Sequence, residues 1–234
     1  MLSILPLREE MNVKNDEIIK KTEEFAQRFF RQEATGHDWW HTHRVRTLAL
    51  KIAQEEVADP FIVEMAALLH DIGDYKFSDG DEQKGREIVS HYLHLLPLST
   101  SLIEKILDIT SSVSYMKTLS PADKSAEIEG SPEFKSVSDA DKLDAIGAIG
   151  IARTFTYGGY YHRPVYDPAI PPNPHISQEE YKTTEGPSLN HFYEKLLKLK
   201  DMMLTSCGKK LARDRHNFLV EYLNRFYQEW EAQK

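Results

Sequence analysis

The sequence predicts an all-α fold, and two observations support this prediction. Apolar side chains recur at helical spacing over most of the chain, and no segment alternates apolar and polar residues as a half-buried strand would. A chain of 234 residues, 41% hydrophobic and 28% charged, is long enough to form one globular domain with a sizeable core. We therefore expect a single domain over 1–234, with a helical core at about 15–156, a loop at 157–187 and C-terminal helices at 188–232.

The expected helices follow from apolar periodicity and from capping residues. Asp59-Pro60 marks the clearest start, because aspartate caps helix N-termini and proline is favoured at the first helical position. The helix after it is apolar nearly all round, which is typical of a helix at the centre of a bundle. In chain order, we expect helices over about 18–30, 39–52, 61–72, 82–96, 99–113, 138–154, 188–204 and 209–230. Ser131-Pro132 lies in the connection before the sixth of these helices.

Proline and glycine interrupt the helical pattern between Tyr157 and Pro187. Both residue types recur along this stretch, and together they forbid a long regular element. Loops of this length are commonly lids, binding loops or disordered segments. The tyrosines among its first ten residues indicate that this loop packs on something.

Composition limits the compartment and the partners. The formal net charge of -8 gives no electrostatic footprint for duplex nucleic acid, although a nucleotide could still bind locally. The single cysteine, Cys207, cannot form an intrachain disulfide or a cysteine-based zinc cage, which suits a reducing cytosol. No apolar run approaches the roughly 18 residues that a spanning helix needs. We expect a cytoplasmic protein without a membrane partner, and the sequence leaves a homodimer open.

Histidine and aspartate occur where apolar helices would carry them inward. His41 continues the core-facing stripe of its helix, although a hydrogen-bonded core histidine would explain it equally. His70 and Asp71 follow directly on an apolar helix, and burying both without a cation or a hydrogen-bond network would be costly. Asp139, Asp141 and Asp144 cluster near an expected helix start, where the helix dipole alone would account for two of the three.

Taken together, these residues resemble the HD-domain phosphohydrolase superfamily, and in particular a stand-alone bacterial clade of it. The superfamily motif is a histidine, then a His-Asp pair, then a distant aspartate, and the order here is His41, His70-Asp71 and Asp141. The resemblance extends to the neighbouring stretches 41–45, 69–74, 139–153 and 156–159, so it covers nearly the whole chain. It implies a compact helical bundle in which these four residues bind a metal ion.

The ligand set agrees with a transition metal. Two imidazoles and two carboxylates suit Mn, Fe, Ni, Co or Zn better than a hard all-oxygen cage for Ca, and we also keep Mg among the candidates. Related binuclear proteins add histidines where this sequence has Asp81-Glu82 and Thr110-Ser111-Ser112. The resemblance therefore implies one divalent ion.

Further residues beside the motif are candidates for catalysis and for phosphate binding. Asp74 lies where related nucleotidases carry an acidic residue, which can orient the attacking water or protonate the leaving group; a surface acid is the alternative. Phosphate needs charge-assisted donors, and Lys76, Arg44, Lys142 and Arg153 are the cations nearest the ligands in sequence. Each of them could instead form a salt bridge to the acidic cluster.

We expect the loop after Tyr157 to lie over the metal pocket and to contact substrate through Tyr157, Tyr160 or Arg163. The predicted function is metal-dependent phosphohydrolysis, as a phosphomonoesterase or phosphodiesterase, by metal-activated water. The expected substrate is a small phosphate ester or anhydride, either a nucleotide or a related metabolite. The alternative is an HD module that binds or senses a nucleotide without turning it over.

Overall fold

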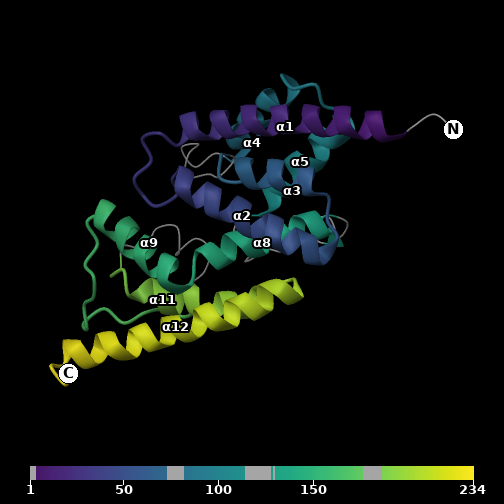
Figure 1. Ribbon diagram of the computed structural model, residues 1–234. Coiled ribbons are helices and arrows are strands. Elements are labelled where there is room, and N and C mark those ends of the chain that lie inside the picture. Colours follow the sequence, from purple (N-terminus) through teal and green to yellow (C-terminus); the bar gives the residue numbers. More distant parts are fainter. Residues whose placement is uncertain (1–3, 73–81, 114–127, 129, 176–185) are drawn as a thin grey trace.

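The computed structural model describes residues 4–72, 82–113, 128, 130–175 and 186–234, and within these ranges every regular element is helical (Figure 1). The predicted all-α fold is confirmed. The elements are α1 (Ile4–Phe29), α2 (Trp39–Glu56), α3 (Pro60–Leu69), α4 (Glu82–His94), α5 (Thr100–Ser112), α8 (Pro132–Asp144), α9 (Gly147–Tyr160), α11 (Asn190–Glu194), the 3-10 helix η3 (Leu196–Met202) and α12 (Ser206–Trp230).

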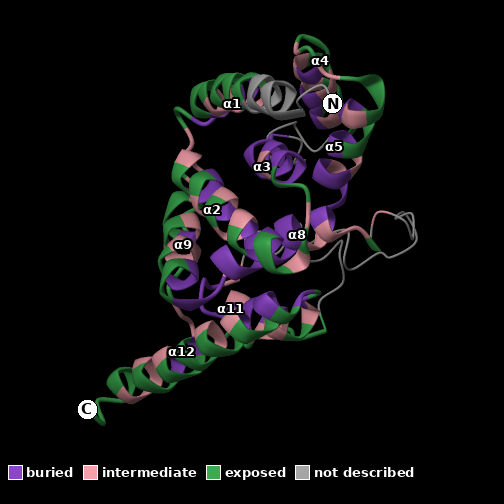
Figure 2. Cartoon of the chain, turned by 45° about the vertical axis from the view of Figure 1, so that its right-hand side comes forward, coloured by how far each residue is buried: buried purple, intermediate pink, exposed green. Residues whose placement is uncertain are grey.

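Helix α3 forms the centre of the bundle, as its apolar sequence predicts. The carboxylate of Asp59 accepts hydrogen bonds from the amides of Phe61 and Ile62, and Pro60 occupies the first turn, so the expected cap is present. All residues from Phe61 to Leu69 are buried except Glu64. The helix packs against α1, α2, α5 and α8, and Figure 2 shows it as a buried segment between them.

The expected helix over 138–154 is wrong in its start and its continuity. Ser131 does not lie in a connection; its hydroxyl accepts from the amide of Phe134 and caps α8, which begins six residues earlier than expected. The chain then breaks between α8 and α9, where Gly147 adopts φ +76, a left-handed conformation that favours glycine. The break allows α9 to contact both α8 and α12.

Helix bounds also differ at three other places. Helix α1 begins at Ile4, earlier than the expected start near residue 18. Helix α9 continues through Gly158 and Gly159, so the loop begins at Tyr161 and not at Tyr157. The helix expected over 188–204 is divided into α11 and η3, because Lys195 between them has a non-helical backbone.

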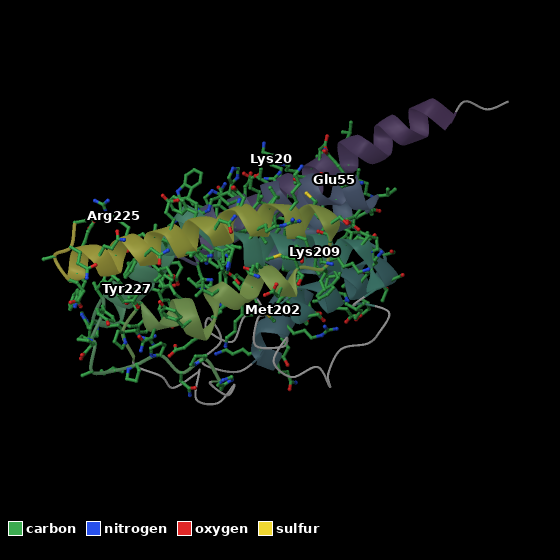
Figure 3. The ribbon with its side chains drawn as sticks, turned by 90° about the horizontal axis from the view of Figure 1, so that it is seen from below. Lys20, Glu55, Met202, Lys209, Arg225 and Tyr227 are labelled. Atoms are coloured by element: carbon green, nitrogen blue, oxygen red, sulfur yellow. The ribbon has the colours of Figure 1, made fainter. Side chains whose placement is uncertain are left out.

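The described part of the loop runs along the C-terminal helices. The amides of Ser188 and Leu189 donate to the carbonyls of Pro164 and Val165, which ties the end of the loop to its beginning. The ring of Tyr166 packs edge-on against Phe226 and Trp230 of α12. Figure 3 shows Tyr227 on the side of α12 opposite to Arg225, and the Tyr227 ring also contacts Tyr166. None of the described helices is long and apolar enough to span a membrane.

Candidate metal centre

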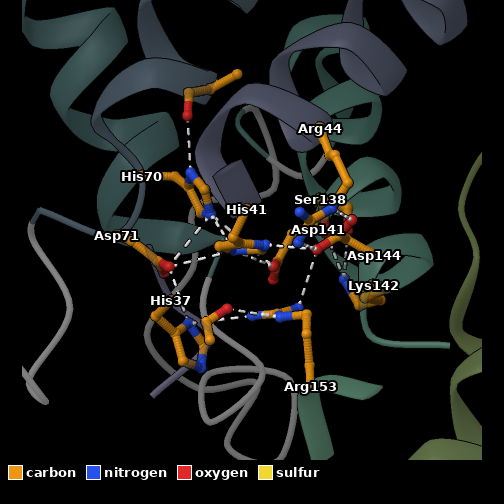
Figure 4. Close-up of polar contacts among 12 residues, drawn as sticks. His37, His41, Arg44, His70, Asp71, Ser138, Asp141, Lys142, Asp144 and Arg153 are labelled. Atoms are coloured by element: carbon orange, nitrogen blue, oxygen red, sulfur yellow. Dashed lines mark hydrogen bonds and ion pairs between the residues drawn. The ribbon is translucent and has the colours of Figure 1, made fainter. Parts of the chain in front are cut away.

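Helix α2 carries His41 into the core. The carboxylate of Asp38 caps this helix by accepting from the amide of His41, at 2.9 Å, and the His41 side chain is fully buried. Its Nδ1 lies 2.7 Å from Oδ2 of Asp144. An ionised carboxylate can only accept, so Nδ1 carries the proton and donates. In the neutral ring this leaves the lone pair on Nε2 of His41, which faces the interior cluster drawn in Figure 4.

His70 reaches the same place from the end of α3. Its Nδ1 donates to the carbonyl of Ala67 at 2.7 Å, so its Nε2 is also unprotonated. The two Nε2 atoms of His41 and His70 lie 3.3 Å apart. Two lone pairs that converge at this distance in a buried site repel each other unless a proton or a cation lies between them. The arrangement therefore fits a metal ion.

The carboxylates of Asp71 and Asp141 each lie close to both imidazoles. Oδ2 of Asp71 is 3.2 Å from His41 Nε2, and its Oδ1 is 3.5 Å from His70 Nε2. Oδ1 of Asp141 is 3.5 Å from His41 Nε2 and 3.9 Å from His70 Nε2. The structure thus brings all four predicted ligands together, from α2, the end of α3 and α8. Their assignment as ligands stays a prediction.

Helix packing explains this convergence. Helix α2 packs closely along α8 and α3, and His41 faces both neighbours from its first turn. The Asp141 side chain is 23% exposed, whereas the other three side chains are almost completely buried. The cluster is therefore reached from solvent on the Asp141 side, which leaves an approach for a small molecule.

The charges in the cluster are stabilised by one another. Burial and nearby Arg153 lower the pKa of His41, but Asp144 and Asp71 outweigh them and raise it above its usual value. Burial would raise the pKa of Asp71, but the imidazoles of His70 and His37 hold it well below its usual range. An ionised Asp71 is the form that a metal ion requires.

Sequence reasoning missed the role of Asp144, which the helix dipole appeared to explain. This buried carboxylate accepts from His41 Nδ1, from Arg44 Nε at 2.7 Å and Nη2 at 3.0 Å, and Arg153 Nη1 lies 3.1 Å from it. Although burial opposes its charge, these partners hold the pKa of Asp144 well below its usual value. Its position three residues after Asp141, on the same face of α8, was the available signal.

His37 was also missed. Its Nδ1 lies 2.9 Å from Oδ2 of Asp71, and its ring packs edge-on against the ring of His41. His37 precedes His41 by four residues, but it lies before the N-terminus of α2, so helical spacing does not place it. Only the folded path of the chain brings it to Asp71.

The predicted phosphate contacts have different surroundings. Arg44 and Arg153 form ion pairs with Asp144, which is the alternative stated for them from the sequence. The Lys142 side chain is buried, and its Nζ donates to the carbonyl and the hydroxyl of Ser138. The predicted catalytic residues Asp74 and Lys76 lie outside the described residues.

The predicted substrate contacts Tyr157 and Arg163 lie near one another. The Arg163 guanidinium is 5.4 Å from the centre of the Tyr157 ring. The Tyr161 ring is 4.6 Å from the Tyr157 ring, and Tyr161 is half exposed. Arg153, Tyr157 and Tyr161 follow one another at intervals of four residues, so they lie along one side of α9 and its last turn.

The helical bundle and its buried His–Asp cluster define a class of helical scaffold with a mixed nitrogen and oxygen site. A family model described as the HD domain matches residues 39–146, a range that contains all four predicted ligands. The YpgQ protein of Bacillus subtilis (strain 168) is 36% identical over 199 residues, which are 85% of this chain and 87% of that protein. The chain therefore belongs to the HD-domain family, and the resemblance stated from the sequence is confirmed.

Solved structures support the same conclusion. The crystal structure of an HD-superfamily hydrolase from Bacillus thuringiensis is 40% identical in sequence, covers 93% of this chain and 99% of its own, and superposes with a TM-score of 0.70. The crystal structure of Bacillus subtilis YpgQ in complex with ADP superposes with a TM-score of 0.69 and covers 90% of this chain and 97% of its own. The sequence identity in that structural alignment is 31%.

Proposed function

We propose that this protein is a metal-dependent phosphohydrolase that acts on a small phosphate ester or anhydride. The observation that carries the proposal is the approach of the Nε2 atoms of His41 and His70 to each other, with the carboxylates of Asp71 and Asp141 close to both. His41, His70, Asp71 and Asp141 would hold one divalent ion, with Mn, Fe, Ni, Co, Zn and Mg as the candidates. A bound ion supplies Lewis-acid activation of water and of a phosphoryl oxygen.

The chain's own residues prepare this site. Asp144 fixes the tautomer and the orientation of His41, and the carbonyl of Ala67 does the same for His70. Arg44 and Arg153 balance the charge of Asp144, and both lie beside the cluster, where a phosphate would bring further negative charge. Asp74 and Lys76 stay proposed catalytic residues, for water orientation and for phosphate binding respectively.

We propose a nucleotide as the substrate class. YpgQ, a relative of this chain, crystallises with ADP. In this chain the rings of Tyr157 and Tyr161 are partly exposed one and two turns beyond Arg153, and a base–aromatic contact is worth about 1–3 kcal/mol. A base stacked on these tyrosines, with Arg163 beside it, would place its phosphates toward Arg153 and the His–Asp cluster.

Nucleotide binding without hydrolysis is the second candidate. The same ADP complex favours it, since a complex establishes binding by YpgQ and not turnover. The two candidates differ in one measurable quantity, which is product formed per protein molecule.

The test is a screen with the purified protein. It is loaded in turn with each candidate metal and incubated with nucleoside mono-, di- and triphosphates, a cyclic nucleotide and p-nitrophenyl phosphate. Separate assays for phosphate, pyrophosphate and nucleoside distinguish monoester, diester and anhydride cleavage. His70→Ala should abolish product formation, whereas His43→Ala, at an exposed position on α2, should not change it.

Each result of the screen has a stated meaning. Metal-dependent product formation that His70→Ala removes supports the phosphohydrolase. Saturable nucleotide binding without product from any substrate supports the binding module instead. Neither binding nor turnover with any metal would contradict both candidates.

A further inference from the structure

The short segment before α2 is held in one conformation. Gly36 has φ +88, a left-handed conformation that glycine adopts without strain. Its carbonyl accepts from Nε of Arg153 at 2.7 Å, which ties the segment to α9. Asp38 caps α2 by accepting from the amide of His41. His37 lies between these two attachments, so its backbone position is fixed on both sides.

The ring of His37 is directed at a predicted ligand. Nδ1 of His37 is 2.9 Å from Oδ2 of Asp71, and its side chain is 19% exposed. Nη2 of Arg153 also approaches this nitrogen, at 3.4 Å. One ring nitrogen cannot accept from an arginine and donate to a carboxylate at the same time. The contact with Asp71 is the shorter of the two and is charge-assisted, so it determines where the proton lies. Nδ1 of His37 carries the proton and donates to Asp71.

This hydrogen bond bears on the orientation of the Asp71 carboxylate. The terminal torsion of an aspartate is broad and poorly defined on its own. Here Oδ1 faces His70, while Oδ2 faces both His41 and His37. A hydrogen bond donated to Oδ2 favours one rotation of the Asp71 carboxylate. In this rotation both of its oxygens lie beside the imidazoles of His41 and His70. Carboxylates that bind metals are generally fixed by such outer hydrogen bonds.

We propose that His37 is a positioning residue for the metal centre, acting through Asp71. The proposal rests on the proposed function, since it takes the four-residue cluster as the metal site. Its consequence is that the segment 36–38, which lies before the matched HD-domain range of 39–146, belongs to the machinery of the site. Arg153 supports this segment indirectly, because it donates to the carbonyl of Gly36 and pairs with Asp144.

The test measures metal affinity and not turnover. Mn²⁺ binding is measured by equilibrium dialysis, and Co²⁺ binding by its visible absorption spectrum, for the wild-type protein and for His37→Leu and His37→Asn. His37→Leu removes the donor and should weaken metal binding by about 10–100-fold. Asparagine places its amide nitrogen near the position of Nδ1, so His37→Asn should restore affinity to within a few-fold of wild type and restore the Co²⁺ spectrum.

His43→Leu is the matched control, because His43 is an exposed histidine of α2 whose ring lies against Trp39 and Trp40. It should bind metal as the wild type does.

Two results would overturn the proposal. Unchanged metal affinity in His37→Leu would mean that the hydrogen bond from His37 does not position Asp71. Equal loss in His37→Leu and His37→Asn would mean that the imidazole itself is required, as a ligand would be. The Mn²⁺ and Co²⁺ measurements do not depend on turnover. Failure of the proposed function in the phosphate screen can therefore be distinguished from failure of the role proposed for His37.

Discussion

At the scale of single residues, Asp144 is the partner on which the orientation of the site depends most. The Asp144 carboxylate accepts from Nδ1 of His41 and thereby directs Nε2 at the cluster. In Asp144→Asn the acceptor oxygen is kept but the charge is lost. We expect metal affinity to fall by about 10–100-fold, measured by equilibrium dialysis with Mn²⁺.

Asp108→Asn is the control for this variant. It also neutralises an aspartate paired with an arginine, Arg86, but on α5, where the Asp108 side chain is 40% exposed. Its metal affinity should equal that of the wild type. A wild-type affinity in Asp144→Asn would show that the ion does not depend on the orientation of His41.

Asp71 and Asp74 should have separate roles. Asp71→Ala removes one of four proposed ligands, so metal retention and activity should be lost together. Asp74→Asn should keep the metal and the substrate affinity and lower turnover by about 10²–10⁴-fold, the usual contribution of a general acid or base. Elemental analysis and steady-state kinetics on the substrate found in the screen measure both. Unchanged turnover in Asp74→Asn would return this residue to the role of a surface acid.

Apolar neighbours place His70 and Asp71 in the interior from the sequence alone, whereas His41 and Asp141 were predicted as ligands from the resemblance to the HD-domain superfamily. His70 and Asp71 follow a helix with no polar side, so the interior is the only place for them. His37 and Asp144 could not be assigned this way. Their roles depend on contacts with residues 34 and 103 positions away, and the only local signal was the spacing of three residues between Asp141 and Asp144.

At the scale of the elements, the break between α8 and α9 determines where Arg153 and Tyr157 lie. Gly147→Ala tests the break. Alanine would have to adopt the left-handed conformation, and its Cβ would lie 3.0 Å from Cγ of Arg215. We expect this variant to lose about 1–2 kcal/mol of unfolding free energy, measured by urea denaturation.

Gly159→Ala is the matched control within the same helix. An added Cβ there meets nothing within 4 Å, and alanine is favoured over glycine in a helix by about 1 kcal/mol. This variant should therefore be as stable as the wild type or more stable. Equal effects of the two substitutions would contradict the conformational role given to Gly147.

The break was missed because apolar and small residues continue across it at helical spacing. A hydrophobic pattern reports which side of the chain is buried, but it does not report the backbone angle of one glycine. The continuation of α9 through Gly158 and Gly159 was missed for a related reason. Glycine weakens a helix by only about 1 kcal/mol, and packing of the helix against its neighbours can outweigh that loss. The cap at Asp59 was predicted correctly, since its hydrogen bonds are to amides two and three residues away.

At the scale of the whole molecule, Asp139 joins the C-terminal helix to the metal-site helix. Its fully buried carboxylate accepts from the amides of Leu204 and Thr205 and from the Thr205 hydroxyl, which itself caps α12. Asp139→Ala would leave these donors without their acceptor. We expect a loss of about 3 kcal/mol in unfolding free energy, because hydrogen bonds to buried charges are among the stronger ones.

Asp201→Ala is the control for this substitution, since Asp201 is an exposed aspartate of η3 just before α12. Thermal unfolding of both variants measures the difference. Similar midpoints for the two variants would contradict a role for Asp139 in docking α12. This contact could not be predicted, because the acid and its donors are 65 and 66 residues apart and the helix dipole already accounted for an aspartate in that place.

The attachment of α12 to Asp139 also determines the order in which a newly made chain can mature. Protein synthesis produces Asp139 long before it produces Leu204 and Thr205, whose amides this carboxylate needs in order to be buried. A nascent chain can therefore bury Asp139 with these donors only after Leu204 and Thr205 have left the ribosome, and we expect α12 to dock late in folding.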